Sequence, residues 1–153
     1  MIVFRLTQER YKTDLSGKGA QLAGGRWNSK GIPLLYTASS RALCVAEVAV
    51  HLPLGILPAD YWLVELELPE TALIEEISVP VLPPDWKNFP HNPETKAFGD
   101  TFFLNQKALV LKVPSAVVQG DFNFLINPAH PEFQLLKILS SELFEFDSRL
   151  FVR

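Results

Sequence analysis

The sequence lacks most of the motifs that mark a common catalytic chemistry. It has no glycine-rich phosphate loop of the Walker type and no dinucleotide-binding fingerprint. Its three histidines lie far apart, at His51, His91 and His130. Cys44 is the only cysteine, so the chain offers no metal-ligand spacing and no internal disulfide. A Cys44–His51 nucleophile pair is excluded by geometry, because seven residues on one helix place the two side chains two turns apart.

The chain also lacks a basic run and a long apolar run. It carries 14 Lys and Arg against 17 Asp and Glu, for a net charge of −3, and its basic residues are scattered. Nucleic-acid-binding proteins usually present a basic stripe to phosphates, so we expect no direct DNA binding. No apolar stretch approaches the roughly 20 residues that span a bilayer. Met1 is followed by no basic or cleavable leader, so we expect a cytoplasmic protein with no membrane contact.

The pattern of apolar residues predicts a single domain over residues 1–153. Strand-like segments occupy residues 2–6, 34–37, 61–68, 108–113, 123–126, 133–139 and 143–146. Helices are predicted at 41–52, with Ser39 or Ser40 as N-cap, and at 95–105. Five prolines between residues 79 and 93 predict a loop. Many strands with two helices predict an α+β fold, in which a mixed, largely antiparallel sheet carries few packed helices.

Three polar residues stand in unusually apolar surroundings within a short stretch of the chain. Glu47 is the only charge in residues 42–50, Arg26 follows two glycines, and Tyr36 ends an apolar strand. Burying a lone carboxylate is costly, so Glu47 must be neutralised, paired or used. We expect one site with opposed charges. A purely structural Arg26–Glu47 ion pair and a core Tyr36 are the plain alternatives.

Weaker candidates extend this cluster. His51 lies four residues after Glu47 on the same helix face, and it also suits a helix C-terminus, where it would interact with the dipole. Ser115 follows Pro114 and either binds a ligand or makes a turn. Asn28 and Asn127 complete the candidate set, although Asn127 precedes a proline and suits a turn.

Several strings of the sequence resemble the RES domain, and the likeness covers nearly the whole chain. They are Gly24-Gly25-Arg26-Trp27-Asn28, Gly31-x-Pro33-Leu34-Leu35-Tyr36-Thr37-Ala38-Ser39, Ala46-Glu47, Phe98-Gly99-Asp100, Val113-Pro114-Ser115-Ala116-Val117-Val118, Asn123-x-Leu125-Ile126-Asn127-Pro128-x-His130 and Phe146-Asp147-Ser148-Arg149-Leu150-Phe151. The Arg, Glu and Ser that give the family its name correspond to Arg26, Glu47 and Ser115.

The resemblance implies a fold and an activity. RES proteins are toxins of bacterial toxin–antitoxin pairs whose antitoxin is a helix-turn-helix protein of the Xre type. Their fold resembles that of ADP-ribosyltransferases, and they consume NAD+ as a substrate, with no resident cofactor or metal. The chemistry of NAD+ fits these residues: Arg26 can meet the diphosphate or the nicotinamide-side phosphate, Tyr36 can lie against the nicotinamide ring, and Glu47 can accept a hydrogen bond from a ribose hydroxyl. Glu47 comes early and on a helix, whereas the glutamate of ordinary ADP-ribosyltransferases comes late and on a strand.

Three functions stay open on this reading. The first is a toxin that cleaves the N-glycosidic bond of NAD+, as a glycohydrolase or a phosphorylase. The second is an ADP-ribosyltransferase that modifies a protein. The third is an inert binding module of a DNA-binding complex, although inert relatives typically lose the charged residues that this chain keeps. No stripe of residues demands a homodimer, which remains possible.

Overall fold

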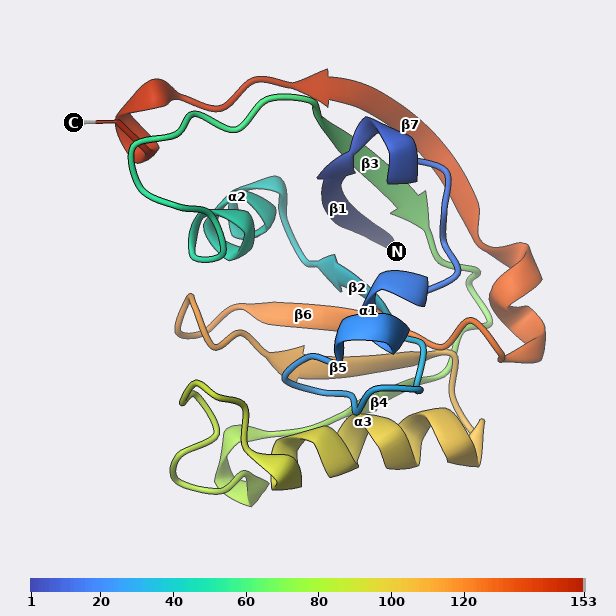
Figure 1. Ribbon diagram of the computed structural model, residues 1–153. Helices are drawn as coiled ribbons and strands as arrows, with labels where there is room; N and C mark the ends of the chain where they lie inside the picture. The colour runs from blue at the N-terminus through green and yellow to red at the C-terminus, as the bar shows by residue number, and fades with distance from the viewer. Residues whose placement is uncertain (153) are drawn as a thin grey trace.

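One seven-stranded sheet forms the centre of the molecule (Figure 1). The computed structural model describes residues 1–152. The strands are β1 (Ile2–Gln8), β2 (Leu35–Ala38), β3 (Tyr61–Glu67), β4 (Ile74–Glu76), β5 (Val110–Pro114), β6 (Phe122–Ile126) and β7 (Lys137–Phe144). Their order is β4-β5-β6-β2-β1-β3-β7; β4 and β5 pair in parallel, and the other neighbours pair antiparallel.

Helices pack on this sheet and complete an α+β domain. Within residues 1–152 the α-helices are α1 (Lys18–Ala23), α2 (Arg41–Ala49) and α3 (Pro93–Asn105). Short 3-10 helices cover Glu9–Tyr11, Val79–Val81, Pro131–Leu135 and Ser148–Leu150. No helix in this part of the chain is both long enough and apolar enough to cross a membrane.

The sheet is weakly joined between β1 and β2. β1 pairs with β3 along its whole length, and β2 does the same with β6. The β1–β2 register, by contrast, consists of the single pair Phe4 opposite Ala38. The two strands diverge away from this pair, so β1, β3 and β7 curve away from β2, β6 and β5 (Figure 1). A cleft can open at this joint because no ladder of backbone hydrogen bonds closes it.

Helix α2 packs over the β1–β2 joint. It begins where the Ser40 side chain accepts a hydrogen bond from the Leu43 backbone N–H at 3.1 Å, an N-cap that satisfies one of the free donors of the first turn. Leu43 and Cys44 are buried against Ala38 of β2 and Phe4 of β1. The helix that carries Glu47 is therefore anchored on both sides of the divergence.

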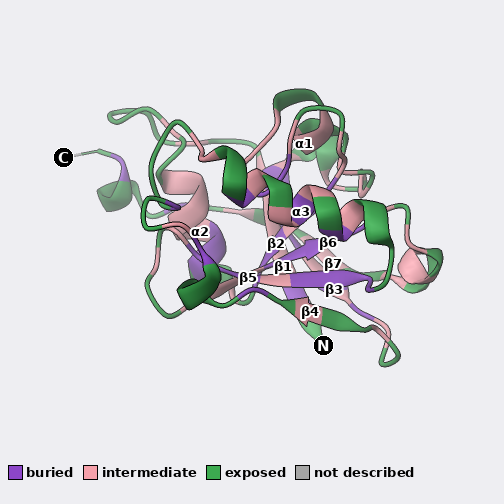
Figure 2. Ribbon diagram, turned by 90° about the horizontal axis from the view of Figure 1, so that it is seen from below, coloured by how far each residue is buried: buried purple, intermediate pink, exposed green. Residues whose placement is uncertain are grey.

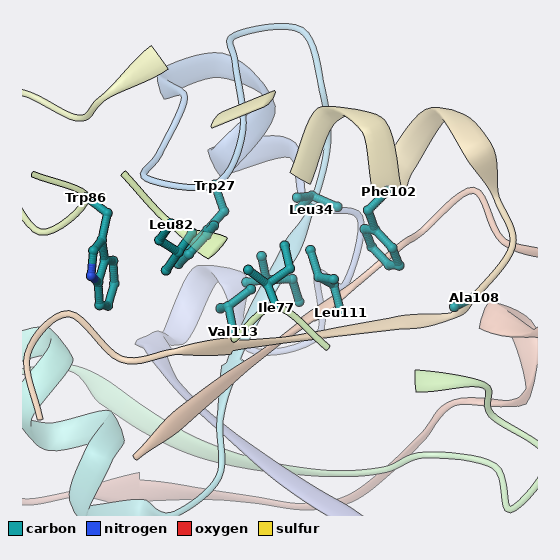
Figure 3. Close-up of a cluster of buried hydrophobic side chains, with 10 residues drawn as sticks. Trp27, Leu34, Ile77, Leu82, Trp86, Phe102, Ala108, Leu111 and Val113 are labelled. Atoms are coloured by element: carbon teal, nitrogen blue, oxygen red, sulfur yellow. The ribbon is translucent and has the colours of Figure 1, made fainter. Parts of the chain in front are cut away.

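Helix α3 covers the half of the sheet that contains β5 (Figures 1 and 2). The apolar residues between them include Trp27, Leu34 and Phe102 (Figure 3). Gly99 of α3 must be a glycine, since a Cβ there would lie 1.7 Å from the Trp27 carbonyl oxygen. Asp100, the next residue, accepts hydrogen bonds from the backbone N–H and hydroxyl of Ser29 at 2.8 and 2.6 Å. The helix thereby fixes the segment that carries Arg26.

The predicted α+β fold is confirmed, and so are most of its elements. The strands expected at 2–6, 34–37, 61–68, 108–113 and 123–126 are present, with ends that differ by one or two residues. Ser40, rather than Ser39, caps α2, which ends at Ala49 instead of residue 52. Helix α3 begins at Pro93 instead of residue 95, because Asn92 caps it by accepting from the Glu94 N–H. The proline-rich segment 79–92 is a loop with one 3-10 turn.

Two expectations about the end of the chain are wrong. Residues 133–139 and 143–146 do not form separate strands, since one strand, β7, spans Lys137–Phe144. Phe133 lies in a 3-10 helix because Pro131 starts a turn that His130 caps. The pairing register of β7 also shifts between Glu65 and Leu66 of β3, which a regular alternation does not reveal. Helix α1 and strand β4 were not expected, and both are short.

Candidate active site

A cavity of about 640 Å³ occupies the cleft where β1 and β2 diverge. Residues of β1, β2, α1 and α2 line it, and the two helices lie on opposite sides of the β1–β2 joint (Figure 1). Four of the residues singled out in the sequence line this one cavity: Arg26, Tyr36, Glu47 and His51. The remaining three candidates do not line the cavity and are buried inside the protein: Asn28, Ser115 and Asn127. The structure thus brings together the cluster expected from the sequence.

Glu47 is held by two neutral donors from the neighbouring strands. Its Oε1 accepts a hydrogen bond from Ser115 Oγ at 2.8 Å and another from Asn123 Nδ2 at 2.7 Å. Within residues 1–152 its second oxygen, Oε2, has no hydrogen-bond partner and is not sealed from solvent. The carboxylate is therefore fixed in orientation through one oxygen, while the other is available to a ligand in the cavity.

Ser115 acts behind Glu47 rather than at the cavity surface. Its hydroxyl accepts hydrogen bonds from the backbone N–H groups of Val117 at 3.1 Å and Val118 at 3.0 Å while it donates to Glu47. Its own N–H donates to the Asp121 carbonyl at 2.8 Å. All of the hydroxyl's hydrogen-bonding capacity is used inside the protein. Ser115 makes a turn, and it positions the candidate catalytic carboxylate.

Arg26 faces the same cavity as a separate charge. Its Nη1 donates to the carbonyl oxygens of Trp86 and, at 3.3 Å, of Asn88, both in the loop 79–92. Burial lowers the pKa of the guanidinium, while the nearby Glu47 and Tyr36 raise it. Among residues 1–152 no ion pair within 4.0 Å joins Arg26 to Glu47. A structural Arg26–Glu47 ion pair is therefore not formed, and the cation remains within reach of a ligand.

Tyr36 lines the cavity, and its hydroxyl is hydrogen-bonded inside the protein. The hydroxyl donates to Asn28 Oδ1 at 2.7 Å and accepts from the Trp27 N–H at 3.2 Å. Burial raises the pKa of the Tyr36 phenol, and the charge of Asp100 adds to this effect. A Cβ at Gly25 would lie 2.7 Å from the Tyr36 hydroxyl oxygen, so the absence of a side chain at Gly25 makes room for Tyr36.

The two asparagines of the candidate set have structural partners. Asn28 is fully buried, and its Nδ2 donates to three carbonyls, those of Ala20, Ser29 and Ile32. Asn28 thus ties α1 to the loop beside Tyr36, and its link to the cavity is the hydrogen bond that it accepts from that tyrosine. Asn127 is also fully buried, but it lies at the far end of β6. There its side chain accepts from the Ala129 N–H at 2.9 Å and donates to the Phe103 carbonyl at 3.2 Å. The structure does not bring Asn127 to the cavity.

His51 and Cys44 both border the cavity but differ in accessibility. His51 is exposed and follows the end of α2, where its N–H bonds to the Val48 carbonyl at 3.1 Å. Cys44 is buried, and burial raises the pKa of its thiol to about 12, with the negative charge of Glu47 adding to the effect. A thiol with that pKa stays protonated at neutral pH and is a poor nucleophile.

Two residues of the site were not singled out from the sequence. Asn123 holds Glu47, and His91 lines the cavity from the loop 79–92. Asn123 carried a usable signal, because an amide in the apolar strand 122–126 demands a partner. His91 carried no such signal, since its position depends on how a proline-rich loop folds back onto Arg26.

The chain belongs to the RES domain family, whose match extends over residues 2–147. It is 41% identical over 139 residues to a Prs ADP-ribosylating toxin of Sphingobium, covering 90% of this chain and 86% of that one. It is 38% identical to the toxin Res of Pseudomonas putida over 99% of this chain and all of the relative. A toxin Res of Photorhabdus laumondii is 36% identical over 98% of this chain and 97% of its own length.

The fold has a counterpart among solved structures. The crystal structure of the Mycobacterium tuberculosis MbcT–MbcA toxin–antitoxin complex contains a chain that superposes with a TM-score of 0.75. The match covers 94% of this chain and 84% of that one at 20% sequence identity. The expected α+β fold is therefore confirmed, and the chain is a member of the RES toxin family.

Proposed function

We propose that this protein is the toxin of a toxin–antitoxin pair and that it cleaves the N-glycosidic bond of NAD+. The observation that carries the proposal is the geometry of Glu47. This single carboxylate is fixed through Oε1 by Ser115 and Asn123 and borders a cavity that Arg26 also lines. A cavity of about 640 Å³ falls within the usual range for small-molecule sites.

The lining residues match the chemical parts of NAD+. The guanidinium of Arg26 keeps its charge at all relevant pH values and therefore suits the diphosphate. Its Nη1 is bonded to the loop, whereas Nε and Nη2 can donate hydrogen bonds to the phosphates. The ring of Tyr36 offers a face to the nicotinamide. Glu47 Oε2 can accept a hydrogen bond from a hydroxyl of the adjacent ribose. His51 at the rim is placed to bind ribose or phosphate.

The chemistry requires only one carboxylate. Glycosidases commonly use a second carboxylic acid to protonate the leaving group. Nicotinamide leaves from a cationic pyridinium: the bond between the ribose carbon and the ring nitrogen breaks, the nitrogen keeps the electron pair, and the leaving group is neutral. Positive charge grows on the ribose as an oxocarbenium ion. The negative charge of Glu47 stabilises it without moving, because Ser115 and Asn123 hold the carboxylate in place.

The acceptor that captures the ribose distinguishes the finer activities. Water gives free ADP-ribose and a proton, phosphate gives a phosphorylated ADP-ribose, and a protein side chain gives a modified protein. Protein ADP-ribosylation is the second candidate, favoured by the 41% identity to a toxin named for ADP-ribosylating Prs. Incubation with labelled NAD+ separates the candidates, since a labelled protein band supports transfer and labelled small molecules alone support hydrolysis or phosphorolysis.

The proposed partner is a cognate antitoxin of the Xre helix-turn-helix type, which would also supply the DNA binding of the complex. We propose that an antitoxin segment enters the cleft and places an acidic group on Arg26, since an available guanidinium attracts a carboxylate. Affinity for the antitoxin should then fall in Arg26→Ala. An unchanged dissociation constant would contradict this mode of inhibition.

The deciding experiment is the cellular NAD+ concentration after induction of the chain, with Glu47→Gln as the matched control. Glutamine keeps the size and the hydrogen-bonding positions but removes the charge. We expect NAD+ to fall with the wild type and to stay constant with the variant. Growth arrest at constant NAD+ would favour protein modification, and normal growth at constant NAD+ would contradict both enzymatic proposals in favour of an inert binding module.

A further inference from the structure

A second histidine lines the cavity beside Arg26. Arg26, His51 and His91 come from three separate segments of the chain, and all three line the cavity. The charges of Arg26, Lys96 and His51 act on His91 and, together with burial, lower its pKa. Of these four groups, Lys96 on α3 is the one that does not line the cavity. Arg26 carries a permanent positive charge and the imidazole of His91 gains one when it is protonated, so an anion in the cavity would be attracted to both groups.

The orientation of His91 leaves one ring edge for a ligand. Its Nδ1 is buried, and within residues 1–152 that atom has no hydrogen-bond partner. Within the same residues Nε2 has no hydrogen-bond partner either, but it is not sealed from solvent, so it is the ring nitrogen that a ligand can reach. The Phe89 ring stands at 90° to the imidazole with 5.2 Å between ring centroids, which restrains the ring. A proton on the accessible Nε2 makes this edge a hydrogen-bond donor.

The loop that carries His91 is itself attached to Arg26. Arg26 Nη1 donates to the carbonyls of Trp86 and Asn88, which precede His91 in this loop. Trp86 is buried against Trp27, the residue next to Arg26, with 5.9 Å between ring centroids. The position of His91 is therefore coupled to that of the arginine by two carbonyl contacts and one aromatic contact. Both cationic groups occupy fixed places relative to one another before any ligand binds.

We propose that His91 binds the anionic diphosphate of the substrate together with Arg26 and His51, so that the loop 79–92 forms part of the binding site. This inference rests on the proposed function, because it identifies the anion as the diphosphate of an ADP-ribosyl group. A diphosphate offers oxygens to several donors at once, which suits donors arriving from three directions. The same donors would also hold ADP-ribose, the product that retains both phosphates.

A pH dependence follows from this arrangement. An anion that accepts a hydrogen bond from His91 favours its charged form, so binding raises a pKa that the free protein holds low. Affinity should therefore increase as the pH falls from 8 to 6. The charged groups that act on His91 are Arg26, Lys96 and His51. Removing both histidines should abolish the dependence, because the diphosphate of ADP-ribose keeps its charge throughout.

The test is the affinity of ADP-ribose for the Glu47→Gln protein, measured by calorimetry. This variant is the parent because it should not turn over the substrate. Adding His91→Gln should weaken binding about ten-fold at pH 6, the loss of one charge-assisted hydrogen bond. His91→Arg should restore affinity and make it less dependent on pH. Lys96→Gln, which removes a neighbouring charge outside the cavity, should change affinity by less than about two-fold.

Several outcomes would overturn the inference. These are absence of ADP-ribose binding to the Glu47→Gln parent, affinity of the His91→Gln protein within two-fold of that parent, or equal losses in His91→Gln and Lys96→Gln. Thermal unfolding midpoints within about 2 °C of the parent would show that a loss is local. NAD+ turnover by the wild type tests the proposed function separately. Turnover with an unchanged KM in His91→Gln refutes this inference alone, and His91-dependent binding without turnover refutes only the proposed activity.

Discussion

Replacing Ser115 by alanine tests how the site is organised. The serine hydroxyl donates one of the two hydrogen bonds on Glu47 and accepts two backbone N–H groups. Alanine removes the donor and leaves Asn123 as the sole support of the carboxylate. The resemblance to the family implied that Ser115 belongs to the site, and its buried position makes it a positioning residue for Glu47. We expect a large fall in kcat and little change in KM.

The magnitude follows from the hydrogen bonds that are lost. A hydrogen bond to a charged group contributes about 1.5–3 kcal/mol, which corresponds to roughly a ten- to hundred-fold lower kcat if the carboxylate loses its orientation. The N–H groups of Val117 and Val118 lose their acceptor, but Val117 is exposed and water can reach its turn. The free energy of unfolding should fall by about 1–2 kcal/mol, a shift of roughly 2–8 °C in the unfolding midpoint.

The assay is steady-state NAD+ consumption by the purified toxin, combined with thermal unfolding of the same samples. Ser115→Thr is the matched control, since it keeps a hydroxyl at this position. A ten-fold rise in KM at unchanged kcat would refute the reasoning, because it would show that Ser115 contacts the substrate directly. Wild-type kcat in Ser115→Ala would refute it equally, because Glu47 would then need only one donor.

Three further predictions concern stability and reactivity. Gly99→Ala should lower the free energy of unfolding, measured by chemical denaturation, by about 3 kcal/mol or more, because a Cβ there would meet the Trp27 carbonyl. Gly19→Ala is the control and should be neutral or stabilising, since a Cβ at Gly19 would have no atom within 4 Å. Tyr36→Phe should lower the free energy of unfolding by about 1–3 kcal/mol in the same assay, because it leaves the Trp27 N–H and Asn28 Oδ1 without their partner. Its KM for NAD+ should change less than about two-fold, since the ring remains. Cys44, with a pKa near 12, should react with iodoacetamide at pH 8 only in denaturant, and rapid labelling of the native protein would show that it is not buried.

The candidate site could be predicted in part because apolar sequence makes polar residues conspicuous. Arg26, Tyr36 and Glu47 each stand among apolar residues, and all three line one cavity. The roles of their partners could not be predicted in the same way. Ser115 and Asn123 reach Glu47 only because β5 and β6 pair beside β2, and no local pattern fixes that order.

The fold shows the same division between local and long-range information. Alternation and an N-cap sufficed for most strands and for α2, since those signals act within a few residues. The end of the chain was misjudged because the cap at His130 and the irregular pairing of β7 with β3 interrupt the apolar pattern of 133–146. His91 was missed for a related reason: its place in the cavity depends on a loop held by Arg26, far away in sequence.

Only one residue pair joins β1 to β2 in the sheet. The two sides of the cavity are therefore supported by different groups of strands. Glu47 is tied through Ser115 and Asn123 to β5 and β6, and Arg26 and Tyr36 lie on the same side of the joint. The opposite side of the cavity is formed by β1 and by Tyr61 of β3. The hydrogen-bond donors to Glu47 thus lie on one side of the joint and β1 lines the other, so the orientation of the carboxylate and the width of the cavity depend on different parts of the sheet.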